Sequence, residues 1–471
     1  MKLKTLTIFL YLMVSIPLFL FFKANVFVWF SFFINYCLIT YISYFHLNKE
    51  RIFSPFLTSY IVFVFLFFIV APIIQIGAIE SMGSTFPNNY PYNVNEVIFS
   101  NFLILIFNLI FFISYLFYKK RKEQNFVQKP QTNTFSRPLV MLVLFMVCFV
   151  IWAINYSYII DEISKSIYSK EAESISILLI RKKVLFLIPL GAIALIFRYL
   201  KKNRKITTNT FISYLMLIIL LSFLLFFKNP LTEKRNALGP IYITLIYLFY
   251  PKLINTNSKF FLFSFVSMII FFPLVSALTH VDANLSEIIQ RPNIIVEDFT
   301  NHGGIVNAFS TLHYDAFPNI VATVSYVGKE GLSLGYQLLS GLLFFIPRSL
   351  WSTKPLSTGE FIGNFLMENH EFTYNNLSNP LVSEGYVNFG ILGVVLMSIL
   401  LSYVVAIFIS WLKSNDTLKE VIAFYFSVHL IFLLRGDFAN GFAYFVGTFI
   451  GVYFIPKLLE RIIFFSLKKT K

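Results

Sequence analysis

Charged residues are scarce in this sequence, and their scarcity excludes an ordinary soluble protein. Asp, Glu, Lys and Arg together make up 13% of the 471 residues, while 57% are hydrophobic and 19% are aromatic. The mean hydropathy is +0.73. A soluble chain of this length needs far more charge to cover its surface. Most of the chain must therefore face lipid, and we expect a polytopic helical membrane protein.

Cysteine and metal-binding motifs are nearly absent as well. The two cysteines, Cys37 and Cys148, lie in apolar runs, where a thiol behaves as a small hydrophobe, so they indicate nothing about the redox compartment. The six histidines are scattered, with no HExxH motif and no Cys/His pair at metal spacing. The short connector 23–25 carries no acidic pair of the kind that holds a divalent metal in many membrane enzymes. We therefore expect no metal site.

Motifs for nucleotide use and for serine catalysis are missing too. The sequence has no G-x-x-x-x-G-K-[ST] run, so nothing argues for direct use of ATP, and it has no G-x-S-x-G elbow. The net charge of +15 would suggest nucleic-acid binding in a soluble domain. In a membrane protein the basic bias of the inner loops explains most of it. We expect no cofactor and no nucleic-acid partner.

Long apolar runs dominate what is present. About twelve of them have roughly the 16 to 25 residues that a helix needs to cross a hydrocarbon core about 30 Å thick. They run approximately over residues 5–22, 26–45, 55–77, 97–118, 139–159, 184–199, 209–227, 239–254, 260–278, 387–411, 418–434 and 438–456. The first resembles a signal peptide, but it has no small-residue cleavage site, so we expect it to remain as a span. The sequence thus predicts an all-α protein with about twelve transmembrane helices.

The distribution of Lys and Arg orients these spans. With the N-terminus inside, most of the 38 basic residues fall in inner segments, above all in 119–137, 198–205 and the tail from Lys457. We therefore expect a multi-pass protein of the cytoplasmic membrane with both termini in the cytoplasm. The run Arg181–Lys183 falls at the outer face in this scheme, where it either snorkels, reads anionic lipid or shows that a span is miscounted.

A long polar stretch interrupts the spans late in the chain. It divides the chain into residues 1–278 with the first nine helices, a large extracytoplasmic loop at 279–386, and residues 387–471 with the last three helices and a basic cytoplasmic tail. Within the loop, 331–347 places leucines on one helical face and contains three glycines. This pattern favours an interfacial or re-entrant helix. We expect any reacting groups in this loop and in shorter loops on the same side.

Basic residues of the outer segments are candidates for binding phosphate. Arginine stays charged and presents a fixed fork of donors that suits bidentate contact with phosphate oxygens. Arg235, Arg348 and Arg435 each lie within a few residues of an apolar run, at the depth of lipid phosphate groups. The outer cations that we take as candidates are Lys234, Arg235, Arg291, Arg348, Lys354 and Arg435. The alternative is that they snorkel or pair with head groups, Asp298 or Asp437.

Aromatic and acidic residues near these cations extend the candidate site. Trp351 is either an interfacial anchor or a stacking platform for a sugar ring, and Tyr386 has the same two interpretations. Glu384 either caps the tenth span or contacts a sugar hydroxyl, as an orienting group or as a base. Asn388, one turn further along, is a further candidate for substrate binding.

Histidines of the long loop supply candidates for a general base that titrates near neutral pH. They are His280, His302, His313 and His370. His313 is favoured because Asp315 is close enough in sequence to orient it. The alternative for each histidine is a structural role.

Three stretches, in this order, resemble bacterial O-antigen and capsule repeat-unit polymerases, the Wzy type. They are KRNALGPIYITLIY (234–247), PRSLWSTKP (347–355) and EGYVNFGILG (384–393). The resemblance implies a multi-span fold related to the GT-C glycosyltransferases. It also implies a reaction on the outer face, without nucleotide or metal, that moves a growing glycan from undecaprenyl pyrophosphate onto the next lipid-linked repeat unit.

The resemblance also implies roles and partners. Outer-loop arginines hold the pyrophosphates in such enzymes, which carries over to Arg235 and Arg348. No family motif chooses the general base among His313, Asp315 and Glu384. The implied partners are the undecaprenyl-pyrophosphate-linked oligosaccharide, membrane lipid, and a chain-length regulator and a flippase of the same pathway.

Two other functions remain as alternatives. A flippase for lipid-linked oligosaccharides also has about twelve or more spans, but such transporters distribute charge through a central cavity and keep their loops short. Here the predicted spans carry almost no ionisable groups and one outer loop is long, which favours the polymerase. An O-antigen ligase has similar chemistry with a different acceptor, and the second and third stretches look more like those of the polymerases.

Overall fold

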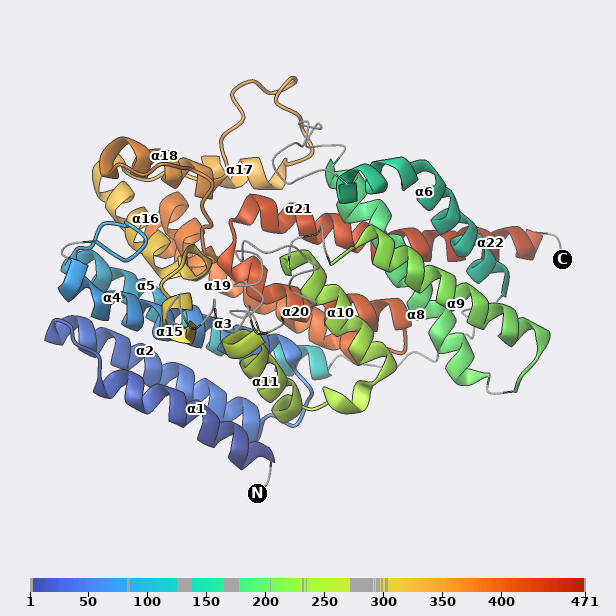
Figure 1. Ribbon diagram of the computed structural model, residues 1–471, viewed down its shortest axis with the longest axis horizontal. Helices are drawn as coiled ribbons and strands as arrows, with labels where there is room; N and C mark the ends of the chain where they lie inside the picture. Colours follow the sequence, from blue (N-terminus) through green and yellow to red (C-terminus); the bar gives the residue numbers. More distant parts are fainter. Residues whose placement is uncertain are drawn as a thin grey trace.

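Helices that follow the apolar runs make up the fold (Figure 1). The computed structural model describes residues 3–82, 85–124, 138–164, 178–203, 205–230, 233, 235–271, 291, 293, 297, 300 and 304–469. Among these residues the sole strand-like pairing is a bridge between Thr85 and Pro91. With α for an α-helix and η for a short 3-10 or π helix, the elements are α1 (Leu3–Leu20), α2 (Val26–Tyr44), η1 (Phe45–Lys49), α3 (Pro55–Phe65), η2 (Leu66–Val70), α4 (Ala71–Met82), α5 (Val94–Gln124), α6 (Pro138–Ser164), η5 (Ile180–Val184), η6 (Leu185–Leu187), α8 (Ile188–Lys202), α9 (Thr208–Phe227), α10 (Arg235–Phe249), η7 (Pro251–Leu253), α11 (Asn257–Val266), η8 (Ser267–Phe271), α15 (Gly304–Ala308), η9 (Leu312–Tyr314), α16 (Ala316–Glu330), α17 (Tyr336–Leu342), α18 (Thr358–His370), α19 (Leu381–Leu412), α20 (Thr417–Arg435), α21 (Phe438–Thr448), η10 (Phe449–Phe454) and α22 (Ile455–Lys469).

Ten helices in the described part of the chain are long and apolar enough to cross a membrane. They coincide with ten of the twelve predicted segments. The other two predicted segments, 239–254 and 260–278, coincide with the shorter apolar helices Asn236–Phe249 and Asn257–Ile270. The all-α, multi-pass architecture is therefore confirmed, while the number of twelve spans stays a prediction.

Aspartate caps fix where α20 and α21 begin. Asp416 Oδ1 accepts a hydrogen bond from the Leu418 amide at 3.0 Å, and Asp437 Oδ1 accepts one from the Asn440 amide at 2.7 Å. Such caps satisfy amides that have no partner within the helix. Because α20 ends at Arg435 and α21 begins at Phe438, only Gly436 and Asp437 separate the two helices. The chain therefore turns sharply there.

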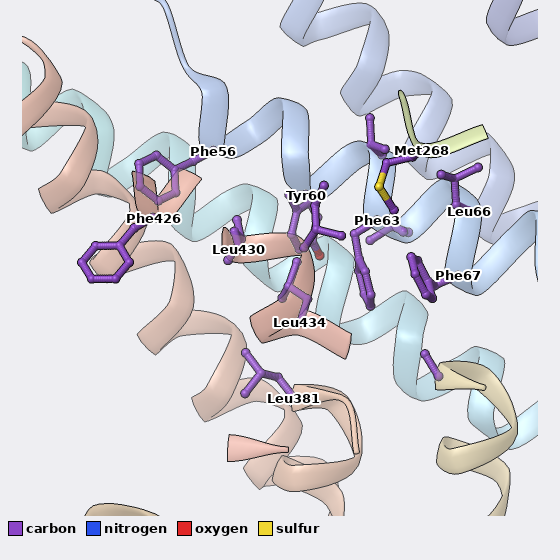
Figure 2. Close-up of a cluster of buried hydrophobic side chains, with 14 of the residues drawn as sticks. Phe56, Tyr60, Phe63, Leu66, Phe67, Met268, Leu381, Phe426, Leu430 and Leu434 are labelled. Atoms are coloured by element: carbon purple, nitrogen blue, oxygen red, sulfur yellow. The ribbon is translucent and has the colours of Figure 1, made fainter. Parts of the chain in front are cut away.

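The centre of the bundle is the continuous helix formed by α3, η2 and α4. The apolar window of this helix, Pro55–Ile79, is 83% buried, whereas the corresponding window of α1 is 17% buried. Figure 2 shows Phe56 and Tyr60 of α3 on the side that faces Leu430 and Leu434 of α20. In a lipid surrounding, close packing rather than the exclusion of water holds such helices together. The packing of α20 on α3 thus positions the turn after Arg435.

The outer helices expose large apolar side chains. Phe27 of α2 is 73% exposed and Ile218 of α9 is 61% exposed. In Figure 1, α1 and α2 lie on one side of the bundle and α6 and α9 on another. Apolar faces of this extent suit contact with lipid.

Within the predicted loop 279–386, the described residues fold into short helices that pack on the bundle. The first nine residues of α16, Ala316–Val324, are buried, and the helix packs against α5 and α19. α17 lies on α21, where Gly341 leaves no room for a side chain against Phe438, and it falls inside the predicted re-entrant segment 331–347. The position of this region outside the membrane stays a prediction.

Candidate functional site

Two buried polar networks meet at the turn between α20 and α21, which consists of Arg435, Gly436 and Asp437. One network starts from Arg435 and the other from Asp437. The first involves α16 and the segment before it, and the second involves α18 and the start of α19; these helices lie near one another in Figure 1. Polar groups are costly inside a membrane protein unless they are paired or used. Their concentration at one turn makes it the candidate functional site.

Arg435 is held by Asp315, which lies 120 residues earlier in the sequence. Arg435 Nη2 donates to Asp315 Oδ1 at 3.1 Å and to the carbonyl oxygen of Leu312 at 2.8 Å. Ser378 Oγ donates to the same Asp315 oxygen at 2.9 Å and accepts from Asn319 Nδ2 at 3.1 Å. The side chain of Asp315 is 5% exposed and that of Arg435 is 26% exposed. The carboxylate therefore orients the guanidinium group and leaves part of it accessible.

One donor of Arg435 lacks a partner among the described residues. Its Nε is buried and makes no hydrogen bond to them. A buried donor without a partner costs about 1–3 kcal/mol. A guanidinium group that is held through one nitrogen by a carboxylate can still bind phosphate oxygens through its other nitrogens. Arg435 thus has the geometry of a pre-positioned anion-binding group.

His313 lies in η9, between the two groups that accept hydrogen bonds from Arg435. It is half-buried. Gln75 of α4 donates through Nε2 to the carbonyl oxygen of Tyr314 at 3.1 Å, which anchors this turn to the central helix. The contacts described for Asp315 go to Arg435 and to a serine, so the orientation of His313 by Asp315 stays a prediction. The backbone places His313 beside the anion-binding group.

Glu384 and Asp437 bring two buried carboxyl groups to the start of α21. Glu384 Oε1 accepts from the Phe438 amide at 2.8 Å, and Oε2 accepts from Thr358 Oγ1 at 2.7 Å. Glu384 is 1% and Asp437 4% exposed. Burial raises the pKa of the Asp437 carboxyl group, although its hydrogen bonds from Asn440 act in the opposite direction. Both oxygens of Glu384 thus attach the start of α18 to α21, which favours a positioning role.

A break in α19 brings Glu384 to this position. The backbone of Phe389 and Gly390 is not helical, and Gly390 has φ of 60°. The chain bends so sharply that a side chain at Gly393 would clash with the carbonyl oxygen of Gly385. The conformation at Gly390 is one that side-chain-bearing residues rarely adopt. The glycines of the EGYVNFGILG stretch therefore serve the backbone geometry that presents Glu384.

Tyr386 and Asn388 pack within the bundle. The Tyr386 ring lies edge to face with Phe99 of α5, with the centroids 5.5 Å apart. Asn388 is fully buried, and its Nδ2 donates to the carbonyl oxygen of Glu384 at 2.8 Å. Both contacts are structural, and substrate binding by these two residues stays a prediction.

The basic run 181–183 joins an ion cluster at the ends of several helices. Lys182 Nζ lies 2.5 Å from Glu162 Oε1 and 3.4 Å from Glu233 Oε1, and Lys228 Nζ lies 3.4 Å from the same Glu233 oxygen. We call these four residues the Lys182 cluster. Burial lowers the pKa of the Lys228 ammonium group, although the Glu233 charge acts to raise it. Lys182 is therefore paired with carboxylates of the chain, which is an outcome that the sequence did not suggest.

Lys183 connects this cluster to α21. Its Nζ lies over the ring of Tyr444, 2.6 Å from the centroid. Burial raises the pKa of Asp437, and the Lys183 charge is among the effects that oppose this rise. The charge of Lys183 therefore acts on the turn through Asp437.

Arg348 and Lys354 stabilise the loop in which they lie. Lys354 Nζ donates to three backbone carbonyl groups at distances of 2.9 to 3.2 Å. Arg348 Nη1 donates to the carbonyl oxygen of Lys354 at 2.6 Å, and Nη2 donates to that of Pro355 at 3.3 Å. Trp351 is half-buried in the same loop, which projects from the body between α17 and α18 in Figure 1. The PRSLWSTKP stretch thus has a structural role that its sequence did not indicate.

The remaining predicted residues contribute little to this picture. Arg291 is exposed, and Arg235 is described only as the first residue of α10. The predicted residues that lie outside the described part of the chain are Lys234, His280 and His302. From the predicted set, the structure brings Arg435, His313 and Glu384 to the networks at the turn.

Sequence reasoning missed most of the partners of Arg435. Asp315 was considered as a partner of His313 and as a candidate base but not as a partner of Arg435, and neither Ser378 nor Tyr90 was considered. Tyr90 OH donates to Asn319 Oδ1 at 2.7 Å, and burial raises the pKa of Tyr90 well above its ordinary value, with the Asp315 charge acting in the same direction. These residues come from separate segments, so no spacing pattern could have linked them.

The described site holds one arginine, one histidine and three acids, and its described residues form no metal centre. Among the described residues, no three His, Cys, Asp or Glu side chains converge as metal ligands. The arrangement can bind an anion through Arg435 and can accept a proton at His313. These are the two functions that a group transfer from a phosphorylated donor requires.

Comparison with known families finds one relevant match. The family model described as O-antigen polysaccharide polymerase Wzy matches residues 377–461. This range contains Ser378, Glu384, Arg435 and Asp437 and therefore much of the candidate site. Nothing among curated proteins and nothing among solved structures matches the chain. The family match confirms the resemblance to Wzy-type proteins and, with the multi-pass helical architecture, supports a role in polysaccharide polymerisation in the membrane.

Proposed function

We propose that the protein joins oligosaccharide repeat units that are linked to undecaprenyl pyrophosphate, on the outer face of the cytoplasmic membrane. The observation that carries this proposal is Arg435, held by Asp315 and with a buried Nε that lacks a partner among the described residues. The group lies within the matched range and next to the half-buried His313.

The donor in this reaction is the growing glycan on its lipid carrier. The bond between the anomeric carbon and the pyrophosphate oxygen breaks, and the pyrophosphate leaves with the bonding electron pair. A fixed guanidinium group in a partly desolvated site stabilises the negative charge that develops there. Arg435 has this role, because a carboxylate already orients it before the substrate binds.

The acceptor is a sugar hydroxyl group of the next lipid-linked unit. Its oxygen forms the new bond to the anomeric carbon, and its proton passes to a general base. His313 has this role, because an imidazole titrates near neutral pH and this one lies in the turn that Arg435 contacts. The energy comes from the phosphate bond of the donor, so the step needs no nucleotide.

Glu384 and Asp437 position the site. Through Thr358 and the Phe438 amide, Glu384 holds α18 and α21 together. Asp437 caps α21 two residues after Arg435. Lys183, next to the Lys182 cluster, contacts Tyr444 of α21 and adds positive charge there, which suits a second pyrophosphate group on the acceptor lipid.

A size ladder of lipid-linked and surface glycan tests the proposal. Cells that lack the gene are compared with and without a plasmid copy. If the protein is the polymerase, the deletion strain contains only single repeat units, and the plasmid copy restores the ladder. Units that accumulate on the cytoplasmic side would instead favour a transporter, and long chains that stay on the carrier would favour a ligase.

A further inference from the structure

A polar pocket lies at the end of α20 opposite to the turn. It is lined by residues of α8, α10, η7 and α20, and its volume is about 420 Å³. Thr417 belongs to its lining and Arg435 to the turn, so the two sites are separated by about 27 Å along the helix, at 1.5 Å per residue. This distance is close to the thickness of a hydrocarbon core, about 30 Å. The pocket and the turn therefore belong to opposite ends of the bundle.

Three cations from one face of α8 line this pocket. They are Arg198, Lys201 and Lys202, at positions i, i+3 and i+4, a spacing that places them on the same side of the helix. Glu420 is the one carboxylate among its described lining residues. The cations thus outnumber the carboxylate in a cavity of the size that holds small ligands, about 300–1,000 Å³.

The contact between Arg198 and Glu420 is loose. Arg198 Nη1 lies 3.4 Å from Glu420 Oε2, and the Arg198 side chain is 48% exposed. Glu420 has a second partner, because Tyr247 OH donates to its Oε1 at 3.1 Å. Glu420 therefore remains hydrogen-bonded when Arg198 turns to another anion. Arginine can give two parallel hydrogen bonds to a phosphate group, which are shorter and stronger than this contact.

The lining also includes apolar side chains. Phe197, Leu248 and Val421 line the same pocket as the cations. A cavity lined by both cations and apolar side chains matches a phosphate group that carries an organic substituent. Basic pockets between membrane helices bind the phosphate head groups of anionic lipids in this way.

We propose that this pocket binds a phosphate group through Arg198, Lys201 and Lys202. The phosphate is either the diester of an anionic lipid head group or free phosphate from solution. The pocket is separate from the turn, so the inference does not depend on the proposed function.

Binding is measured in two arms with the full-length protein in nanodiscs. In the first arm, nanodiscs of phosphatidylcholine with a minor fraction of phosphatidylglycerol are used, and native mass spectrometry counts the phosphatidylglycerol molecules retained. In the second arm, nanodiscs of pure phosphatidylcholine are titrated with inorganic phosphate. The test variant is R198Q/K201Q/K202Q. The matched control is K49Q/R51Q/K120Q, which removes the same charges from exposed positions outside the pocket.

We expect the test variant to bind about a hundredfold more weakly than the wild type in one of the two arms, because it loses all three cations that attract the phosphate group. Loss in the first arm identifies a lipid head group, and loss in the second identifies free phosphate. A second variant, E420Q, removes the competing charge and is expected to bind about threefold more tightly. Equal binding by the test and control variants in both arms would overturn the proposal.

Discussion

Arg435 and Asp315 form an ion pair with 3.1 Å between Nη2 and Oδ1, and this pair joins the end of α20 to the segment before α16. The two residues lie 120 positions apart, so the pair exists only in the folded chain. It holds a cation at the point where two long helices turn. The catalytic account depends on this arrangement.

Asp315→Asn tests the positioning of Arg435. The substitution keeps the shape of the side chain but removes the charge that holds the guanidinium group. We expect polymer formation to fall by about tenfold or more, mainly through kcat, because a misdirected donor stabilises the leaving group less well. Initial rates over a range of lipid-linked substrate concentrations separate kcat from KM. Asp416→Asn is the control, because it retains a cap on α20 at the opposite end, and equal rates for the two variants would refute the positioning role.

Asp437→Asn tests whether ionisation of the buried Asp437 carboxyl group destabilises the folded protein. Burial raises the pKa of Asp437 above its ordinary value of 3.8, so the folded state holds the proton more tightly than the unfolded state. The contribution of this group to stability is fully present below pH 3.8 and is lost as the pH rises through the folded pKa. We expect the wild type to lose thermal stability relative to D437N as the pH is raised above 4. A midpoint difference that stays constant with pH would show that Asp437 ionises normally.

Glycine substitutions test the break in α19. A side chain at Gly393 would meet the backbone of Gly385, whereas one at Gly390 would meet only a side-chain atom of Leu332 at 3.8 Å but would have an unusual φ. We expect G390A to destabilise the protein by about 1–3 kcal/mol and G393A to destabilise it more. Gly77→Ala is the control, because the site in α4 has no atom within 4 Å and alanine is favoured by about 1 kcal/mol in a helix. Thermal unfolding in detergent ranks the three variants, and a G393A midpoint at or above that of G77A would contradict the described bend.

Lys354→Met tests whether the projecting loop is held by its own lysine. The substitution removes the three hydrogen bonds from Nζ to backbone carbonyl groups. We expect faster cleavage of residues 343–357 by an added protease, because local opening controls such cleavage. Lys329→Met makes the same chemical change on α16 and serves as the control. The same cleavage rate in both variants would mean that Lys354 does not hold the loop.

The Lys182 cluster gives a prediction about buried charge. Glu233→Gln removes the carboxylate that Lys182 and Lys228 share. Removal of one partner of a buried pair costs about 3–5 kcal/mol, so we expect a clear fall in the unfolding midpoint. The double variant E233Q/K228M also removes the Lys228 charge that E233Q leaves without a partner, and we expect it to recover part of the lost stability. A double variant no more stable than E233Q would show that Lys228 is not the residue left unpaired.

The long apolar helices could be predicted from the sequence because uninterrupted apolar runs mark them. All twelve predicted segments coincide with helices, ten of them long enough to span a membrane. The helix that corresponds to the predicted span 184–199 starts earlier, at Ile180, and so includes the basic run 181–183. Hydropathy could not show that Lys182 is paired with Glu162, because the two lie on different helices.

The candidate site could be predicted only in part. Arg435 was found because a cation beside an apolar run is conspicuous. Its partner Asp315 was assigned to His313, since nearness in sequence was the sole guide to contact. Arg348 was expected to hold pyrophosphate, but its described hydrogen bonds go to carbonyl groups of its own loop. Every residue has a backbone carbonyl group, so the sequence does not indicate which of them will accept a hydrogen bond from Arg348.

The most direct test of the account is the polymerisation reaction of the purified protein with lipid-linked single repeat units. Wild type, R435K, R435A and the control R461A, which changes an exposed arginine of α22, are compared by the length of their glycan products. The account predicts long products and released carrier pyrophosphate from wild type and R461A. It predicts a loss of about a hundredfold for R435A, with partial activity for R435K. A folded R435A that makes products of wild-type length at the wild-type rate would contradict the central role of Arg435.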